Sequence, residues 1–432
     1  MLLALPTLSV RAERNVSRTP IGRADHAIFE PPADLEKAGP SINGRAAIVV
    51  ELKTGTVLYA KNIHTQMYPA STTKVLTGLM AVENLALSDS VPISHTAANM
   101  AYSGLGSNWE GRVLTAEEAL YGLLLRSVNG LGHALAEKMG GSVENFAAMM
   151  NRRAAQAGAL QTHFTNPHGL NDTRHVTTAY DMAKIMWDAI EIDDFRRISG
   201  TYSYTCSRSG WSVTWEHTMC PMTPTNYWYD TRVVCGKTGW TEDALQCRAI
   251  YARDGQRDLI ICLFYSDDTV ESDVRTLLNY GFSYPAPSGS TMLSDYRLQE
   301  GCVSGFEPGT TAETFRSHIR FPGASGWVLT DEAGVKKQAA DTMKTGDRIW
   351  IRASDGSPWY SASAVLYGDV NGDGMINISD LIKVRNHILG ENRLQGAYSR
   401  SADVSRDSLI NISDLIKVRN HILGENVIPQ KD

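Results

Sequence analysis

Regularly spaced hydrophobic residues divide the N-terminal part of the chain into strands and helices. Two β-hairpins are expected, because two pairs of apolar runs each flank a short polar turn that contains glycine. Between and after these hairpins, apolar residues at three- and four-residue spacing predict helices. The expected strands are 46–52, 56–59, 245–251 and 258–264, and the expected helices are 115–125, 131–139, 143–158, 178–190 and 274–282.

The order of these elements indicates an α/β domain over residues 45–284. Strands come first, helices follow, residues 197–265 return to strands, and a last helix closes the segment. Such an order predicts an antiparallel sheet flanked by helices, with an inserted helical subdomain. The stretch 285–293, which contains Pro, Ser and Gly, indicates a linker. Residues 294–366 are expected to form a small β-rich module.

The clearest repeat lies near the C-terminal end, in residues 367–427. The segment Ile376–Asn392 recurs without change as Ile410–Asn426, 34 residues later. A period of this length is typical of small repeated units that pack against each other. Each copy contains one run with helical spacing, so this module is expected to be all-α.

The N-terminal segment predicts export. Residues 1–12 are a short apolar stretch that ends in small residues, as a secretory signal does, although the usual basic residues at its start are missing. We therefore interpret 1–12 as a truncated signal peptide and expect an exported bacterial protein, extracellular or at the cell surface. Residues 13–44 are polar and contain Pro, Gly and Asp, which indicates a loose leader.

Charge and composition exclude several classes of protein. The formal net charge is −6 and the chain has no Lys/Arg block, which argues against nucleic-acid binding. No apolar run is long enough to span a membrane. The six cysteines show neither Cys-x-x-Cys spacing nor paired histidines, so zinc is not indicated. Most are expected to be single core thiols, with Cys206 and Cys220 as the one plausible disulfide pair.

The first candidate for chemistry is Ser71, three residues before Lys74 at the start of an apolar run with helical spacing. On a helix, positions i and i+3 share a face, so the hydroxyl and the amine can meet. A hydroxyl is a weak nucleophile until a neighbouring base takes its proton, and an unprotonated lysine can do this. Taken alone, the pattern also fits an ordinary helix start with Ser71 or a threonine as its cap.

Two further motifs follow in order along the chain. Ser127 and Asn129 come after a helical run, where a second hydroxyl can relay a proton and an amide can hold a substrate backbone. Lys237, Thr238 and Gly239 follow a run that predicts a strand. They offer a positive charge, a hydroxyl that can bind a carboxylate, and a glycine that lets a substrate lie along the strand.

Each of these motifs has a second match in the chain. Ser41-Ile42-Asn43 also fits Ser-x-Asn, and Lys344-Thr345-Gly346 also fits Lys-Thr-Gly. The first is rejected because it precedes Ser71 in the leader. The second is rejected because it lies in the small β-rich module, beyond the elements expected to complete the sheet.

The motifs Ser-x-x-Lys, Ser-x-Asn and Lys-Thr-Gly in this order are the signature of penicillin-recognising serine enzymes. Over residues 45–282 the chain resembles the low-molecular-mass D-alanyl-D-alanine carboxypeptidases. The segments that carry the resemblance are Pro69–Lys74, Leu123–Asn129, Thr162–Leu170, Thr177–Asp181 and Gly236–Thr241. The resemblance implies a β-lactamase/DD-peptidase-like fold. It also implies a serine-type carboxypeptidase that acts on peptidoglycan stem peptides, is inhibited covalently by β-lactam antibiotics and needs no cofactor for catalysis.

The resemblance further implies a role for each motif residue. Ser71 would attack the D-Ala-D-Ala carbonyl to form an acyl-enzyme, with Lys74 as its base. Partial burial and a nearby Lys237 ammonium would keep Lys74 neutral. Ser127 would pass the proton to the leaving D-alanine. Substrate would be bound by the Asn129 amide, by Lys237, Thr238 and Gly239 at the terminal carboxylate, and by the backbone N–H groups of Ser71 and Trp240 as the oxyanion hole.

Other activities stay open at this point. Class A β-lactamases use a glutamate on a Glu-x-x-Leu-Asn loop to release the acyl group, and no such string lies between Ser127 and Lys237. Many relatives carry an arginine between the last strand and the last helix, where it holds the terminal carboxylate. Here that loop, Ser266–Ser272, is acidic and has none. A DD-endopeptidase, and a penicillin sensor or wall-docking adaptor without turnover, are therefore kept as alternatives.

Histidines and aromatic residues close to the motifs are expected to be structural. The family mechanism has no histidine step, which makes His168 and His175 structural residues. A group of aromatic residues could contact the stem peptide, but core packing is the expected role. These residues are Trp211, Trp215, Tyr227, Trp228 and Tyr229.

The C-terminal repeat resembles a pair of calcium loops, with oxygen ligands at loop positions 1, 3, 5, 7, 9 and 12. The first set is Asp369, Asn371, Asp373, Met375 (carbonyl), Asn377 and Asp380, and the second is Asp403, Ser405, Asp407, Leu409 (carbonyl), Asn411 and Asp414. The second loop is weaker because Ser408 stands where glycine belongs. An Asp at position 12 and a single helix after each loop are similar to dockerin, which docks enzymes onto cohesin-bearing scaffolds of the cellulosome. The resemblance implies up to two structural Ca²⁺ ions and a cohesin partner. Two helical hairpins without a ligand are the alternative.

Overall fold

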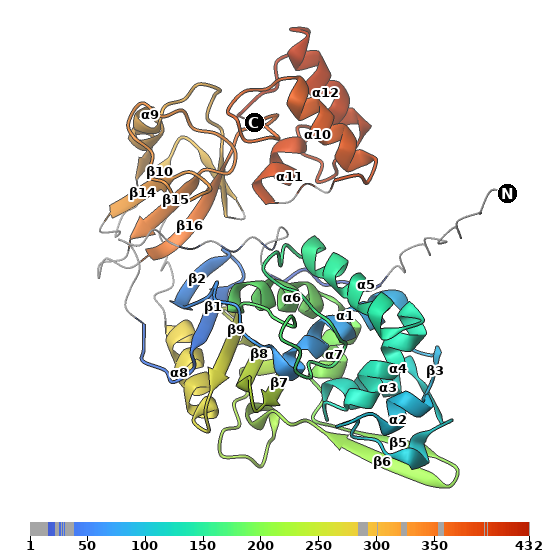
Figure 1. The fold of residues 1–432 in the computed structure, drawn as a ribbon. Helices are drawn as coiled ribbons and strands as arrows, with labels where there is room; N and C mark the ends of the chain where they lie inside the picture. The colour runs from blue at the N-terminus through green and yellow to red at the C-terminus, as the bar shows by residue number, and fades with distance from the viewer. Residues whose placement is uncertain are drawn as a thin grey trace, which may run out of the picture.

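The computed structural model describes residues 16–21, 26, 28, 30, 39–283, 293–299, 301–320, 326–352, 358–392, 394 and 396–431. A large α/β domain is followed by two smaller modules, one rich in strands and one helical (Figure 1). The expected signal peptide, 1–12, and almost all of the expected linker, 285–293, lie outside the described residues.

A five-stranded antiparallel sheet forms the centre of the α/β domain, with the order β2-β1-β9-β8-β7. Strands β1 and β9 are nearly continuous buried apolar runs, because both faces of the sheet are covered. Both predicted hairpins are confirmed, and they join where β1 pairs with β9. The strands are β1 Ala46–Glu51, β2 Thr56–Lys61, β7 Val233–Thr241, β8 Leu245–Arg253 and β9 Asp258–Ser266.

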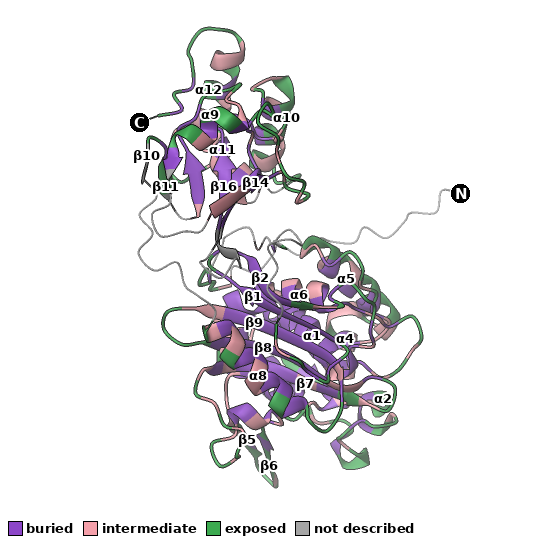
Figure 2. Ribbon diagram, turned by 90° about the vertical axis from the view of Figure 1, so that its left-hand side faces the viewer, coloured by how far each residue is buried: buried purple, intermediate pink, exposed green. Residues whose placement is uncertain are grey.

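Helices cover the two faces of this sheet (Figure 2). Helix α8 (Val270–Ser283) packs on one face through an apolar cluster that includes Val274 and Leu277. The inserted helical subdomain packs on the other face through a larger cluster around α1 and α6. Its helices are α1 Lys74–Asn84, α2 His95–Asn99, α3 Ala116–Leu124, α4 Asn129–Gly140, α5 Val143–Gln156, α6 Ala179–Glu191 and α7 Asp193–Ser199.

The predicted helices are confirmed, but the prediction that strands resume at residue 197 is wrong. Residues Asp193–Ser199 form helix α7, which buries Phe195 and Ile198. Asp193 and Asp194 in its first turn stabilise it, because carboxylates favour a helix N-terminus. Two short hairpins also flank the helical subdomain. They are β3 Ser90–Pro92 with β4 Val113–Thr115, and β5 Ser203–Arg208 with β6 Trp211–Glu216.

The described residues of the leader pack against the domain, so its interpretation as loose is wrong for them. Ile21 is buried, and its carbonyl accepts a hydrogen bond of 2.8 Å from Trp187 Nε1. His26 lies 2.7 Å from an Asp188 oxygen and stacks on the Trp187 ring. Polar composition did not reveal this contact, because only a few residues of the leader, among them Ile21, His26 and Ile28, carry it.

The cysteines and aromatic residues only partly follow the sequence predictions. All six cysteines lie among the described residues and none of them forms a disulfide, so Cys206 and Cys220 do not pair in the structure. Trp215 is buried, as core packing requires, but the side chain of Tyr227 is 81% exposed and that of Tyr229 is 43% exposed. Core packing is therefore wrong for these two tyrosines.

The β-rich module contains a second five-stranded sheet, ordered β11-β12-β16-β15-β14. Strands β12 and β16 run parallel, and the other neighbours are antiparallel. The elements are β10 Leu293–Ser294, β11 Arg297–Gln299, β12 Cys302–Ser304, α9 Ala312–Ser317, β13 Ile319–Arg320, β14 Gly326–Thr330, β15 Arg348–Arg352 and β16 Pro358–Val365.

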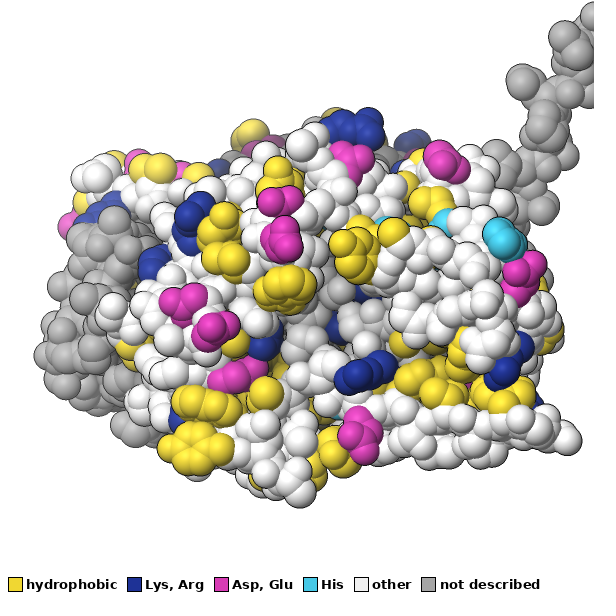
Figure 3. Space-filling model, turned by 60° about the horizontal axis from the view of Figure 1, so that its bottom comes forward, with side chains coloured by type: hydrophobic (Ala, Val, Ile, Leu, Met, Phe, Trp, Pro, Cys, Tyr) yellow, Lys and Arg dark blue, Asp and Glu magenta, His cyan; other side chains and the backbone are white. Residues whose placement is uncertain are grey.

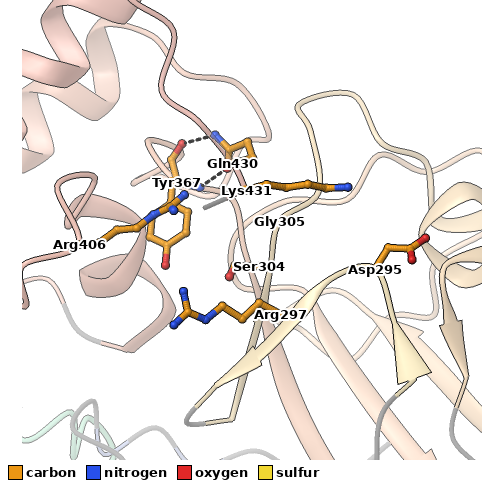
Figure 4. Close-up of a pocket in the computed structure, with 8 residues that line it drawn as sticks. All are labelled: Asp295, Arg297, Ser304, Gly305, Tyr367, Arg406, Gln430 and Lys431. Carbon is orange, nitrogen blue, oxygen red and sulfur yellow. Dashed lines mark hydrogen bonds between the residues drawn. The ribbon is translucent and has the colours of Figure 1, made fainter.

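The helical module consists of α10 (Ile378–Ile388), α11 (Gly396–Ala402) and α12 (Ile412–Ile422). Its buried cluster includes Val384 and Val418 from the two repeats, together with Cys302 and Val365 from the β-rich module. Across the same junction, the Gln430 side chain exchanges two hydrogen bonds with the Tyr367 backbone. A pocket beside this contact is lined by residues of both modules (Figure 4). The two modules therefore share one core.

No helix in the described part of the chain is both long and apolar enough to cross a membrane.

Candidate active site and calcium loops

Ser71 lies in a short 3₁₀ turn, Ala70–Thr73, that leads directly into α1 and places Lys74 at the first position of that helix. Lys74 Nζ is 2.7 Å from Ser71 Oγ, which confirms the contact expected from the i, i+3 spacing. The same nitrogen is 2.7 Å from Asn129 Oδ1 and 2.6 Å from the backbone oxygen of His168. The first two predicted motifs therefore meet at one buried amine.

Lys74 is fully buried, and burial is the main reason that its pKa lies well below the ordinary lysine value. The charge of Lys237 lowers this pKa further. Removing a cation from water penalises its charged form, and a second cation nearby adds to the penalty. This shift favours the neutral state of Lys74, in which its nitrogen can accept a proton.

Ser127 occupies the loop between α3 and α4, just before Asn129 begins α4. Its φ of +64° is uncommon for a residue with a side chain, and such strain is often retained at functional sites. The Ser127 hydroxyl makes no hydrogen bond with the described residues, whereas Asn129 Nδ2 donates to the carbonyl of Tyr102 at 2.7 Å. Asn129 is thus tied into the site, and the role of Ser127 stays a prediction.

Lys237, Thr238, Gly239 and Trp240 lie inside strand β7, and not after a strand as the sequence suggested. Lys237 is buried and its Nζ donates to the Thr238 carbonyl at 2.9 Å. Burial, and then the charge of Arg248, lower the Lys237 pKa to about 7. Thr238 Oγ1 is 2.7 Å from Thr218 Oγ1.

Gly239 is required because β7 runs against the turn that holds Ser71. A Cβ atom at this position would lie 3.0 Å from Ser71 N and 3.0 Å from the Pro69 oxygen. The backbone N–H of Ser71 and the end of β7 are therefore close neighbours. On the face shown in Figure 3, Lys or Arg side chains lie deep in a central hollow.

The two histidines are structural, as predicted. His175 Nε2 is 2.8 Å from Thr73 Oγ1, and burial lowers its pKa to about 3. Burial also lowers the pKa of His168 to about 2, so both rings are neutral near pH 7. The sequence missed the carbonyl of His168 as a partner of Lys74. A backbone carbonyl has no residue signature, so no signal in a single sequence could have shown it.

The sequence also missed Arg248 on β8. Arg248 pairs across the sheet with Thr238, and Nη2 is 2.6 Å from Glu271 Oε1 in the first turn of α8. Both side chains are buried. The signal was present, because an arginine within an apolar strand needs a buried partner, and Glu271 stands in the acidic loop already noted.

In the first calcium loop, the side chain of Asp369 is buried and already accepts several backbone hydrogen bonds. Its Oδ1 accepts from Gly372 and Asp373, and its Oδ2 accepts from Thr345 of the β-rich module at 2.9 Å. Burial, and then the negative charges of Asp380 and Asp373, raise the Asp369 pKa to about 6. The loop therefore gathers negative charge that a divalent cation would neutralise.

The second loop brings together Asp403, Asp407 and Asp414, with one oxygen from each within 4.8 Å of the others. Ser408 takes a φ of +68° where the first loop has Gly374 at +87°, so the serine does occupy the glycine position. Both loops offer hard oxygen donors and no sulfur, which fits Ca²⁺.

Comparisons with known proteins agree with this geometry. Residues 33–267 match the family model described as D-alanyl-D-alanine carboxypeptidase, and residues 367–423 match that of the dockerin type I domain. The chain is 32% identical over 250 residues to D-alanyl-D-alanine carboxypeptidase DacF of Bacillus subtilis (strain 168), a match that covers 55% of this chain and 62% of DacF. It is 31% identical over 264 residues to DacB2 of Mycobacterium tuberculosis, covering 58% and 88%.

A solved structure gives the same result for the fold. The crystal structure of D-alanyl-D-alanine carboxypeptidase from Mycobacterium tuberculosis H37Rv superposes with a TM-score of 0.54 at 28% identity. The superposition covers 59% of this chain and 96% of that one. The similarity is thus confined to the α/β domain and extends over nearly the whole of the solved protein.

Proposed function

This chain belongs to the D-alanyl-D-alanine carboxypeptidase family, and we propose that it removes the terminal D-alanine from peptidoglycan stem peptides through an acyl-enzyme on Ser71. The observation that carries the proposal is the position of Lys74 Nζ, 2.7 Å from both Ser71 Oγ and Asn129 Oδ1. A buried amine so placed can act as a base without any cofactor.

In the acylation step, Ser71 Oγ bonds to the carbonyl carbon of the penultimate D-alanine while its proton passes to Lys74 Nζ. The negative oxygen that forms is held by the N–H groups of Ser71 and Trp240. The C–N bond then breaks, and Ser127 relays the proton from Lys74 to the leaving amine. The close approach of β7 to the turn supports this geometry, because a Cβ atom at Gly239, the residue before Trp240, would lie 3.0 Å from Ser71 N.

In the deacylation step, water attacks the ester carbon, Lys74 takes a proton from that water, and Ser71 leaves as the free hydroxyl. Lys237 and Thr238 receive the carboxylate of the terminal D-alanine before it departs. Burial lowers the pKa of both lysines, and the charge of Lys237 lowers that of Lys74 further, which favours Lys74 as the base while Lys237 is charged.

Release of D-alanine from a stem pentapeptide tests the proposal. The wild type should release D-alanine catalytically, and Ser71→Ala should release none. Penicillin labelling of Ser71 without release of D-alanine would indicate a penicillin sensor and not an enzyme. Cleavage only of cross-linked dimers would indicate an endopeptidase, and rapid hydrolysis of the β-lactam itself would indicate a β-lactamase.

The dockerin type I domain supports a second part of the proposal, namely that the enzyme is carried on a cohesin-bearing scaffold outside the cell. The first Ca²⁺ would be held by Asp369, Asn371, Asp373, Met375, Asn377 and Asp380, and the second by Asp403, Ser405, Asp407, Leu409, Asn411 and Asp414. Bound calcium would neutralise these carboxylates and fix the loops.

The exposed faces of α10 and α12 support cohesin docking. Ile378 and Ile412 are 58% and 67% exposed, and Leu389 and Leu423 are 61% and 60% exposed. Equivalent residues of the two repeats thus present the same apolar surface. Either helix can offer this surface to one cohesin, in orientations related by a pseudo-twofold axis.

A further inference from the structure

A buried ion pair lies at the end of the sheet where substrate would bind, and the proposed mechanism does not use it. Arg248 Nη2 and Nε lie 2.6 Å and 3.2 Å from Glu271 Oε1. The remaining Nη1 donates to Gln246 Oε1 and to the Cys247 carbonyl. Four of the five N–H donors of the Arg248 guanidinium therefore bind protein oxygens.

This ion pair is adjacent to the residues proposed to receive the terminal carboxylate. Arg248 stands directly opposite Thr238 in the β7–β8 register, and directly opposed residues of an antiparallel pair share one face of the sheet. The Lys237 ammonium is 2.9 Å from the Thr238 carbonyl and 3.5 Å from its hydroxyl. Two cations, from β7 and β8, thus converge on Thr238.

Of these two cations, Arg248 alone has an ion-pair partner, Glu271, among the described residues. The glutamate carries one negative charge against one positive charge on Arg248, and its Oε2 has no hydrogen-bond partner among the described residues. Lys237, in contrast, contacts only neutral oxygens. A substrate carboxylate would therefore be attracted mainly by Lys237.

We propose that Glu271 sets the selectivity of this enzyme for a free terminal carboxylate by neutralising Arg248, the second cation beside Thr238. The inference rests on the proposed function. Arg248 and Glu271 are positioning and specificity residues here, because they act through the charge that the carboxylate meets. With Glu271 in place, the enzyme would discriminate less between a peptide with a free carboxylate and one without it than it would if Arg248 were uncompensated.

The test compares kcat/KM for a D-Ala-D-Ala peptide with that for its carboxyl amide. Glu271→Gln leaves Arg248 uncompensated and should raise the acid-to-amide ratio about tenfold, as a hydrogen bond to a charged group does. Arg248→Gln leaves a buried carboxylate and should lower the ratio by about the same factor. The double variant restores neutrality and should return to the wild-type ratio. Glu271→Asp, which keeps the charge, is the matched control.

A purely structural role would give a different pattern, because both peptides would then lose kcat/KM together and the ratio would not change in either single variant. That result overturns the proposal. Penicillin labelling of Ser71 reports folding of every variant. If penicillin labels the wild type but the terminal residue is released from neither peptide, the proposed function itself has failed.

The wild type alone provides a second test, which needs no variant to fold. Lys237 faces Lys74 from α1, Arg248 from β8 and His217 from the segment before β7, while Cys220 in that segment lies beside Glu271 and Arg248. Lys237 loses its charge as the pH rises through about 7, while the compensated Arg248 does not. The preference for the free acid in kcat/KM should therefore disappear between pH 6 and 9. A preference that persists undiminished to pH 9 shows that Arg248 attracts the carboxylate and overturns the proposal.

Discussion

The α/β domain and the helical module each gather like charges in a small volume, but they relieve the repulsion in opposite ways. At the active site, burial and Lys237 lower the pKa of Lys74, so a proton leaves and a neutral base remains. In the first calcium loop, burial and neighbouring carboxylates raise the pKa values of Asp369 and Asp380. Here a bound divalent cation would neutralise the carboxylates. At the active site the protein itself relieves the repulsion between the lysines, whereas in the calcium loop a bound cation would balance the carboxylate charges.

The comparison shows that a cluster of like charges can serve two different purposes. Lys74 is useful because its charged form is penalised, so that an amine that is ordinarily protonated at neutral pH can be present as the free base. The aspartates are useful because their charged forms are kept together by the loop and attract Ca²⁺. The two sites should therefore respond to different perturbations, and the predictions below separate them.

The largest expected effect is on covalent labelling by a fluorescent penicillin. Ser71→Ala should abolish labelling completely, because Ser71 is the hydroxyl that Lys74 contacts at 2.7 Å. Ser41→Ala, which alters the rejected Ser-x-Asn match in the leader, is the control and should label as wild type does. Labelling of another serine in Ser71→Ala would contradict the assignment. Calcium binding should be unchanged in both variants.

Chelation of Ca²⁺ should affect the helical module and leave the active site unchanged. Removal of Ca²⁺ should loosen α10, α11 and α12 and abolish capture by a cohesin, while Ser71 acylation stays within about twofold of its original rate. Calcium at a hundred times its dissociation constant stabilises a folded site by about 2.7 kcal/mol, which this treatment would remove. Hydrogen exchange of the full chain, with calcium and with chelator, measures the change. A parallel loss of penicillin labelling would show that the two sites are coupled.

The pH dependence of acylation should reveal the lowered pKa of Lys74. The neutral base is present above this pKa and disappears as the pH falls below it, so kcat/KM should fall about tenfold per pH unit on the acid side. Because the pKa lies well below the ordinary lysine value, the rate should already be high near pH 7. A rate that keeps rising up to pH 10 would mean that Lys74 is not lowered enough to be the base.

The smallest effect concerns the two calcium loops themselves. Ser408→Gly should stabilise the helical module by about 1 kcal/mol, because glycine adopts a positive φ without the steric cost that serine has at +68°. Thermal unfolding with calcium present measures it. Gly374→Ser in the first loop is the matched reverse change and should destabilise by a similar amount. No change in either variant would show that the two positions are equally tolerant.

The sequence predicted those parts of the molecule that depend on regular spacing or on complete motifs. The hairpins β1–β2 and β8–β9 follow from apolar runs around glycine turns, and the contact of Ser71 with Lys74 follows from three-residue spacing. The two calcium loops follow from ligand spacing. In each case the residues that determine the structure lie close together in the sequence.

The sequence failed where a contact joins distant segments through the backbone or through one side chain. The His168 carbonyl at Lys74 and the Ile21 carbonyl at Trp187 have no residue signature. The partnership of Arg248 with Glu271 depends on how α8 returns to the sheet, which the sequence order alone does not specify. Thr345 of the rejected Lys344-Thr345-Gly346 match donates its backbone N–H to Asp369, a contact that the sequence pattern did not indicate.

The core shared by Cys302 and Val365 with Val384 and Val418 determines what can be transplanted. A fragment that begins at Tyr367 would lose Cys302 and Val365 from that core, and also the Thr345 N–H that donates to Asp369. The unit to transplant is therefore the β-rich module together with the helical module, because the two share one buried cluster. An enzyme fused to both modules would carry the complete buried cluster, whereas the repeats alone would expose part of it to solvent.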